Sequence, residues 1–262
     1  ALQEDPNINL MEEPGLNIGY IAFNVEKEPF DNAKVRKALN YALDRDAIID
    51  AIFYGYAQKA KNPIPPAVLG YNEDIEDYDY NPDKARELLA EAGYEDGFST
   101  TLWAMPVSRP YNPNARRMAQ MVQSDWSKIG VETRIVSYEW GEYLKRTAQG
   151  EHETAFFGWT GDNGDPDNFL YTLLGCSGIE AGTNLARWCN EDFNDLVIEA
   201  QKTTDRDKRA ELYQQAIAIF KEHNPWITID HSTVFVPLQK SVKGYVMDPM
   251  GGHYFHEVDV ER

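Results

Sequence analysis

A polar, glycine-broken run at residues 158–168 carries the residue types best suited to bind a ligand. It reads Gly-Trp-Thr-Gly-Asp-Asn-Gly-Asp-Pro-Asp-Asn between two short apolar stretches, so we expect a loop that follows a strand. Its carboxylates, Asp162, Asp165 and Asp167, come shortly after the aromatic Trp159. In open α/β folds, small molecules bind where strands end. The run therefore predicts a site for a positively charged ligand group.

Arg109 offers the opposite charge on another loop, the proline-rich segment Met105–Pro113. A guanidinium on a stiff loop binds a carboxylate through paired donors and never loses its charge. Arg109 and Asp162 could hold opposite ends of a zwitterion, with Trp159 and Tyr111 as apolar walls between them. An amino acid or a short peptide with free termini is such a zwitterion. The alternative for Arg109 is an ion pair on the surface.

Two other chemistries of the acidic loop fit its spacing less well. Asp162 and Asp165 are three residues apart on one loop, whereas the paired carboxylates of a glycoside hydrolase flank a bond from separate elements. A calcium loop would place its acids at relative positions 1, 3 and 5, but here they stand at 1, 4 and 6 with Pro166 between them. We expect no catalytic residue, no metal site and no cofactor. The histidines are dispersed, at His152, His223, His231, His253 and His256.

The bulk composition excludes several classes of partner. The chain has 262 residues, 42% of them hydrophobic, which is enough for a substantial core. Its net charge of −18 would repel nucleic acid and anionic membranes. No apolar run reaches the roughly 18–20 residues of a membrane span, and the first residues do not resemble a signal peptide. We interpret the sequence as a mature chain or as a fragment of one.

A predicted series of alternating helices and strands places both loops. A helix begins at Pro82 after the capping Asn81 and ends at Gly93. The next elements are expected, in order, as strand Thr100–Ala104, a helix opened by Asn112-Pro113 and ended by Gly130, strand Val131–Ser137, a helix near Trp140–Gln149 and strand Thr154–Trp159. This β-α-β-α-β series implies an α/β fold with a mainly parallel sheet flanked by helices. The loops at 105–112 and 159–168 therefore open at the carboxyl ends of strands.

Further elements are expected on both sides of this series. They are strand Gly19–Asn24, helices Asn32–Leu43, Asp46–Tyr54, Glu191–Gln201 and Asp205–His223, and β-like runs at Trp226–Ile229, Thr233–Val236 and Val242–Val246. The segment Asn62–Pro66 holds three prolines and reads as an extended connection.

The two cysteines, Cys176 and Cys189, are 13 residues apart. This spacing suits a disulfide, which would indicate an oxidising compartment. Two unpaired thiols in a cytosolic protein are the alternative. Neither cysteine stands at metal-ligand spacing from a histidine, so zinc is not expected.

Long runs of this sequence resemble the peptide/nickel class of extracellular solute-binding proteins of bacterial ABC importers, and in particular its dipeptide-binding members. The runs are Arg109–Ala119, Tyr138–Arg146, Gly158–Phe169, Lys61–Pro66, Asn81–Arg86 and Lys243–Val246. The resemblance extends from about Gly15 to the end of the chain.

The resemblance implies a role for each candidate residue. In that family a two-lobed protein closes on its ligand, an aspartate meets the peptide amino group and an arginine meets its carboxylate. By motif these residues fall on Asp162 and Arg109, and Trp159 and Tyr111 correspond to the aromatic walls. The two cysteines match a pair in the family, which favours the disulfide. The resemblance also implies export to the periplasm, delivery to an inner-membrane ABC permease and no catalysis. Carriers of haem, glutathione or other peptide-like ligands are the alternative in this fold, and a carboxylate-dependent hydrolase is a remote one.

Family members run to roughly twice this length, and the resemblance covers only their second half. We therefore expect residues 1–14 to be a lead-in near the hinge, residues 15–233 to be the second, ligand-binding lobe, and residues 234–262 to return to the missing first lobe. Two charge-assisted anchors contribute about 3–6 kcal/mol, whereas micromolar binding requires about 8 kcal/mol. This chain alone is therefore predicted to bind dipeptides weakly.

Overall fold

The structure of the chain is a computed structural model that describes residues 4–248 and 250–261. Residues 1–3 of the expected lead-in, and residues 249 and 262 of the expected returning segment, lie outside the described residues.

Within the described residues, seven strands form one mixed sheet in the order β1-β7-β2-β6-β4-β5, with β3 paired to β7. The strands β4, β5 and β6 are parallel, and the other pairings are antiparallel. The predicted α/β class is confirmed, and the parallel part is the predicted β-α-β-α-β series. The bounds are β1 Ile8–Pro14, β2 Asn17–Phe23, β3 Ala57–Lys59, β4 Phe98–Trp103, β5 Val131–Val136, β6 Thr154–Thr160 and β7 Trp226–Gln239, with β8 Val242–Lys243 and β9 Asp259–Val260 as a separate pair.

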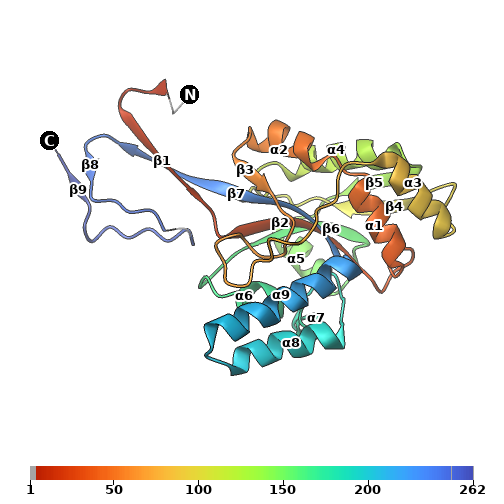
Figure 1. The fold of residues 1–262 in the computed structure, drawn as a ribbon. Coiled ribbons are helices and arrows are strands. Elements are labelled where there is room, and N and C mark those ends of the chain that lie inside the picture. Colours follow the sequence, from red (N-terminus) through yellow and green to blue (C-terminus); the bar gives the residue numbers. More distant parts are fainter. Residues whose placement is uncertain (1–3, 249, 262) are drawn as a thin grey trace.

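Helices pack against both faces of this sheet (Figure 1). Their bounds are α1 Ala33–Tyr41, α2 Arg45–Phe53, α3 Pro82–Glu91, α4 Ala115–Ser127, α5 Trp140–Ala148, α6 Asp167–Leu174, α7 Ser177–Ala181, α8 Glu191–Lys202 and α9 Arg206–His223. Side chains alternate along β2, so Ile21 and Phe23 enter the core under α1 to α4, whereas Tyr20 and Ala22 enter the core under α6, α8 and α9. The central strand therefore joins two apolar cores. No helix in the described part of the chain is long and apolar enough to cross a membrane.

Asparagines begin several of these helices. The side chains of Asn32, Asn81, Asn114 and Asn190 each accept a hydrogen bond from a backbone N–H in the first turn. The helix α4 therefore begins after Asn114, and the prediction of a start at Asn112-Pro113 is wrong. The reason is that the backbone of Asn112 pairs with that of Arg109 in a tight turn.

The strand β7 is longer than predicted and belongs to two environments. Its first half, Trp226–Ser232, is buried in the sheet, whereas its second half pairs only with β1 and is partly exposed. The two β-like runs expected here are therefore one continuous strand. Figure 1 shows β1 and the outer half of β7 leaving the body as a ribbon, with β8 and β9 beyond it. The strand predicted at Val242–Val246 is confined to β8, and β1, β3, α6 and α7 were not predicted.

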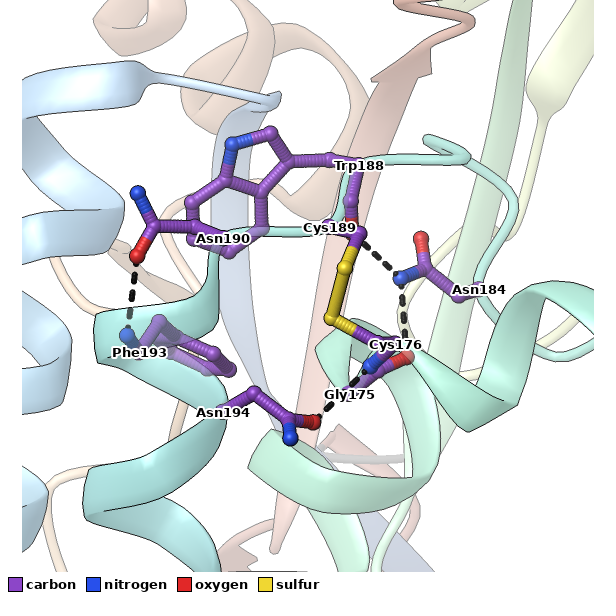
Figure 2. Close-up of a disulfide and its surroundings, with 8 residues drawn as sticks. All are labelled: Gly175, Cys176, Asn184, Trp188, Cys189, Asn190, Phe193 and Asn194. Carbon is purple, nitrogen blue, oxygen red and sulfur yellow. Dashed lines mark hydrogen bonds between the residues drawn. A yellow bond between two sulfur atoms is a disulfide. The ribbon is translucent and has the colours of Figure 1, made fainter.

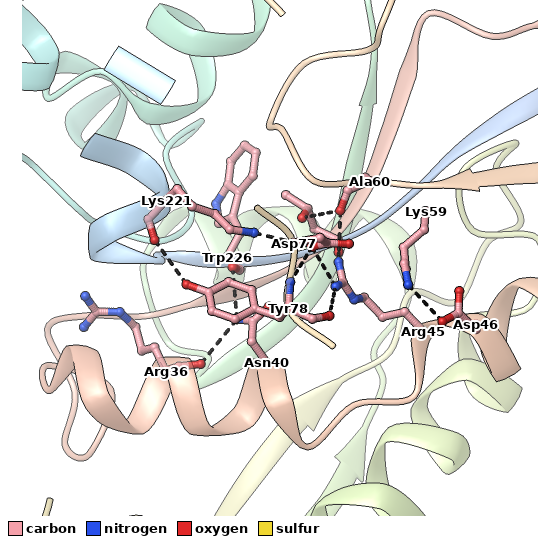
Figure 3. A network of polar contacts seen from close by, with 11 residues as sticks. Arg36, Asn40, Arg45, Asp46, Lys59, Ala60, Asp77, Tyr78, Lys221 and Trp226 are labelled. Atoms are coloured by element: carbon pink, nitrogen blue, oxygen red, sulfur yellow. Dashed lines mark hydrogen bonds and ion pairs between the residues drawn. The ribbon is translucent and has the colours of Figure 1, made fainter. Parts of the chain in front are cut away.

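A buried arginine holds the long connection between β3 and α3 against the sheet (Figure 3). The Arg45 guanidinium donates to the carbonyls of Ala60, Thr228 and Tyr78 at 2.7–3.0 Å and pairs with Asp77 at 2.8 Å. These contacts join α2, the connection and β7. The segment Asn62–Pro66 lies in this connection and forms no helix or strand, as predicted, but it contains bends and a turn rather than a uniformly extended backbone.

Candidate functional site

The four residues predicted to bind ligand lie on two neighbouring loops and at the end of the strand that leads into one of them. Arg109 and Tyr111 follow β4, Trp159 is near the end of β6, and Asp162 follows β6. Because β4 and β6 are adjacent and parallel, both loops open at the same edge of the sheet, as predicted. The loops therefore bring a cationic side chain, an anionic side chain and two aromatic rings to one region.

The arginine loop is a closed turn. The backbone of Arg109 donates to and accepts from Asn112, at 3.0 and 2.9 Å. The half-buried Arg109 side chain donates to the Ser108 carbonyl at 3.0 Å, and its guanidinium lies 5.3 Å from the ring centre of Trp140. A guanidinium carries five N–H donors, so this geometry leaves capacity for an anionic ligand group.

The Tyr111 ring packs closely against the backbone of β6, and Gly158 makes this possible. A Cβ atom on Gly158 would lie 2.2 Å from Cδ2 of the Tyr111 ring. Burial raises the pKa of Tyr111, an effect that the nearby Arg109 opposes. We did not predict a role for Gly158, although a glycine inside a strand signals a close approach of another group.

Asn168, in the first turn of α6, holds both Trp159 and Asp162. Its Oδ1 accepts from the Trp159 indole at 2.8 Å and from the Asp162 backbone N–H at 2.9 Å. Its Nδ2 donates to the Asp162 carboxylate at 3.1 Å. The Asp162 carboxylate is exposed at the rim. Asn168 was quoted in the motif but was not predicted as a site residue.

The three acids of this loop do not act as one cluster. Asp165 makes a paired contact with the guanidinium of Arg209 on α9, with both N–O distances at 3.1 Å. Asp167 accepts from Gln201 on α8 at 2.6 Å. Asp165 and Asp167 therefore anchor the loop to α9 and α8, and Asp162 is the acid of this loop that we predicted to meet a cationic ligand group. Among the described residues, no group of three His, Cys, Asp or Glu side chains is arranged to hold a metal ion.

An apolar pocket of about 220 Å³ opens between Tyr111 and Trp159. Aromatic and small side chains form its walls, namely Tyr20, Tyr111, Trp140, Leu144, Thr147, Phe157, Gly158, Trp159, Leu173, Gly182, Thr183 and Leu185. This lining suits an uncharged side chain of a ligand rather than its charged ends.

Arg109 borders a second, larger pocket of about 650 Å³. Its other walls come from the end of α2, from the outer half of β7 with Phe235, and from the tail with Tyr245 and His253. Arg109 thus borders the larger pocket beside the ribbon, and its guanidinium lies near Trp140, which lines the smaller pocket.

Cys176 and Cys189 form a disulfide, as the resemblance implied (Figure 2). Asn184 reinforces the closed loop by donating to the carbonyls of Gly175 and Trp188, at 3.1 and 2.8 Å. Gly182, Thr183 and Leu185 lie inside this loop and line the apolar pocket. The disulfide therefore supports one wall of that pocket.

Known proteins resemble this chain over almost its whole length. Residues 1–181 match the family described as Bacterial extracellular solute-binding proteins, family 5 Middle. The chain is 57% identical over 260 residues to the Dipeptide-binding protein of Escherichia coli (strain K12), which covers 99% of this chain and 49% of the relative. It is 52% identical over 260 residues to Heme-binding protein A of Haemophilus influenzae, and this match covers 99% of this chain and 47% of that relative.

A solved structure has the same fold. It is the dipeptide-binding protein from Pseudoalteromonas sp. SM9913 in complex with Met-Leu, with a TM-score of 0.92 and 41% identity. The match covers 99% of this chain and 51% of that one. The chain thus spans about half the length of the proteins that it matches.

Proposed function

The chain belongs to family 5 of the bacterial extracellular solute-binding proteins, and on this basis we propose that it is the ligand-gripping half of a dipeptide-binding protein that serves an ABC importer. Asp162 would bind the peptide amino group and Arg109 its carboxylate, with Tyr111 and Trp159 as walls. The proposed role is binding and delivery, without a chemical reaction.

One observation carries this proposal. Arg109 and Asp162 lie on adjacent loops at one edge of the sheet, and each is close to a wall of the apolar pocket. The Arg109 guanidinium lies 5.3 Å from the ring centre of Trp140, and Asn168 joins Asp162 to Trp159. Opposite charges near one apolar pocket match a zwitterion with a side chain between its ends. The use of Asp165 and Asp167 as structural anchors weighs against the remote alternative of a carboxylate-dependent hydrolase.

The division into lobes also belongs to this proposal. Burial changes along β7 at Ser232 and Thr233, where the ribbon leaves the body. This position supports a ligand-binding lobe at residues 15–233, a lead-in at residues 1–14 near the hinge, and a returning segment at residues 234–262. The first lobe would cover the large pocket beside Arg109, including Phe235 and Tyr245.

The first lobe is needed for tight binding. Two charge-assisted hydrogen-bonded anchors contribute about 3–6 kcal/mol, and micromolar affinity corresponds to about 8 kcal/mol. We propose that burial by the first lobe supplies the difference. The disulfide fits an oxidising compartment, so we place the protein in the periplasm, with an inner-membrane permease as its partner.

A carrier of haem, glutathione or another peptide-like ligand is the second candidate. The specific reason is the 52% identity to Heme-binding protein A of Haemophilus influenzae, which nearly equals the identity to some dipeptide-binding relatives.

The test is a thermal-shift panel on the full-length protein that carries these residues. The ligands are free dipeptides, their N-acetylated and C-amidated forms, tripeptides, haem and glutathione. We expect stabilisation by free dipeptides that is lost when either end is blocked, and in the Asp162→Asn and Arg109→Ala variants. The exposed residues Asp195 and Arg116 provide matched controls, Asp195→Asn and Arg116→Ala, which should respond like the unchanged protein.

Stabilisation by haem or glutathione alone would replace dipeptides with the second candidate. Dipeptide binding that survives both Asp162→Asn and Arg109→Ala would refute the proposed grip. For the 262-residue chain alone, isothermal titration should show binding weaker than micromolar.

A further inference from the structure

We propose that Asn168 is a positioning residue that couples the aromatic wall of the site to its ammonium-binding carboxylate, so that Trp159 and Asp162 act as one unit. This inference rests on the proposed function for the role of Asp162, but the coupling itself is a property of the chain.

The donor and acceptor types at Asn168 permit one orientation of its amide. The Trp159 indole nitrogen and the Asp162 backbone nitrogen are donors only, so both must face Oδ1, as they do at 2.8 and 2.9 Å. The Nδ2 group then faces Oδ2 of Asp162 at 3.1 Å. An ionised carboxylate accepts this bond and keeps its other oxygen for a ligand. One side chain therefore sets the position of the indole, of the loop backbone and of the carboxylate.

Asn168 is itself held in place by its helix α6 and by contacts with α8 and α9. It stands in the first turn of α6, where the next residues, Phe169 and Leu170, are fully buried. The loop before it is fastened by Arg209 of α9, which grips Asp165 with two hydrogen bonds. The residue before it, Asp167, accepts from Gln201 of α8. These contacts make α6 a fixed base, so the Asn168 amide is a rigid reference for the two binding residues.

Two substitutions separate the functions of this amide. Asn168→Asp keeps an acceptor for the indole and for the backbone, but it turns a carboxylate oxygen toward Asp162 in place of the donor. Asn168→Leu has a similar size and removes all three contacts. Asn163→Ala is the matched control, because Asn163 lies on the same loop and its side chain accepts from the Asp165 backbone.

The first readout uses the 262-residue chain and needs no ligand. Exchange of the Trp159 indole N–H with solvent should accelerate about tenfold or more in Asn168→Leu, because its hydrogen bond is lost. It should stay slow in Asn168→Asp and Asn163→Ala. The carbon NMR signal of the Asp162 carboxylate should move in Asn168→Asp, because a carboxylate oxygen replaces the amide donor that faces it.

The second readout uses the full-length protein with Met-Leu and its N-acetylated form. The affinity for free Met-Leu should fall about tenfold in Asn168→Leu, while the weak affinity for the acetylated form changes little. The preference for a free amino group should therefore shrink, which a general loss of stability would not produce.

An unchanged indole exchange rate in Asn168→Leu, or an unchanged Asp162 carboxylate signal in Asn168→Asp, would overturn the coupling. If Asn168→Leu also disturbs the amide signals of residues 169–174, Asn168→Asp decides, because it keeps the acceptor that serves the backbone. If neither the unchanged protein nor any variant binds Met-Leu, the proposed function fails. The indole and carboxyl measurements still decide whether Asn168 couples Trp159 to Asp162.

Discussion

The side chain of Asn17 clamps Ser232 at the point where β7 leaves the body of the molecule. Its Oδ1 accepts from the Ser232 backbone N–H at 2.8 Å and from the Ser232 hydroxyl at 3.1 Å, and its Nδ2 donates to the Ser232 carbonyl at 3.1 Å. Both residues are buried. Gly15 donates to the same carbonyl, and a Cβ atom on Gly15 would lie 2.1 Å from Nδ2 of Asn17. The base of the ribbon is therefore a fixed joint.

Replacing Asn17 should loosen this joint. In Asn17→Ala, buried groups of Ser232 lose their partners, so we expect a stability loss of about 1–3 kcal/mol. Amide hydrogen exchange should also accelerate in residues 8–14 and 233–239. Asn9→Ala, at an exposed position on the same ribbon, is the control and should change neither quantity. Equal exchange in both variants would show that Asn17 does not fix the joint.

A side chain at position 158, in place of Gly158, should destabilise the fold. In Gly158→Ala the new Cβ would meet the Tyr111 ring at 2.2 Å and the Ile18 carbonyl at 2.4 Å, so the aromatic wall or the strand pair must shift. We expect a stability loss of about 1–3 kcal/mol, measured by urea unfolding, and a changed Tyr111 ring environment by NMR. Gly141→Ala is the control, since its nearest neighbour is the flexible Glu139 carboxylate. A wild-type Tyr111 signal in Gly158→Ala would contradict the packing described here.

Substitution of the buried Arg45 should cost far more stability than substitution of an ion-paired residue at the surface. Arg45→Met removes the closest cation from Asp77, which keeps Lys221, and it removes a donor from three backbone carbonyls, so we expect a loss of about 3–5 kcal/mol in the free energy of unfolding. The control is Lys59→Met, which removes the exposed pair with Asp46 shown in Figure 3 and should cost about 0–1 kcal/mol. Similar losses in the two variants would mean that burial of Arg45 confers no special role.

The contacts of Arg45 with Asp77 should also make the stability of the fold depend on pH. Burial alone would raise the pKa of Asp77, but Arg45 and Lys221 outweigh it, so the pKa lies below its usual range. A lowered pKa adds stability above the unfolded value of about 3.9 and loses it as the pH falls through the folded value. Arg45→Met should reduce this acid-dependent part of the stability.

The disulfide should stabilise the wall of the apolar pocket. Closing a 13-residue separation contributes about 3 kcal/mol in the chain-entropy model, so the double variant Cys176→Ala, Cys189→Ala should lose about that much. A reductant should lower the melting temperature of the unchanged chain and leave the double variant unaffected. Faster amide exchange at Thr183 and Leu185 in the double variant would place the effect at the pocket. A melting temperature that is insensitive to reductant in both proteins would contradict it.

Asp230 should make stability fall with rising pH. It is fully buried in β7, and neither of its side-chain oxygens has a hydrogen-bond partner among the residues that the structure describes. Burial therefore raises the pKa of Asp230 well above its usual range. A raised pKa gives stability that is complete below about pH 3.9 and is lost, by about 1.4 kcal/mol per pH unit, as the pH rises toward the folded value.

The variant Asp230→Asn tests this effect. Its advantage in unfolding free energy over the unchanged chain should grow from pH 4 upward, measured by denaturant unfolding at several pH values. The neighbouring His231, whose pKa burial lowers to about 4, acts in both proteins and cancels in the difference. Asp79→Asn, at an exposed aspartate, controls for net charge. A difference that does not depend on pH would show that Asp230 is ionised in the folded chain.

The local elements and the placement of the two candidate loops were predictable because short-range chemistry governs them. Asn81 and Pro82 begin α3, and apolar residues at helical spacing bury one face of α4. Alternation of helices and strands implied parallel strands, and this placed the loops of Arg109 and Asp162 at one edge of the sheet. The charges and aromatic rings of the proposed dipeptide site were thus visible in the residue types.

Only the tertiary structure decided which of these residues act together. Asp162 and Asp165 are the same residue type on the same loop. However, Arg209 of α9 pairs with Asp165, whereas Asp162 is exposed at the rim. Other arrangements also depend on tertiary contacts that no local pattern encodes. They are the hydrogen bonds of Asn168, the packing of Tyr111 on Gly158 and the hydrogen bonds between Asn17 and Ser232. The outer half of β7 was misjudged for the same reason, because its partner β1 lies more than 200 residues away in the chain. Sequence determined the chemistry that is available at this edge of the sheet, and packing of distant segments determined how it is arranged.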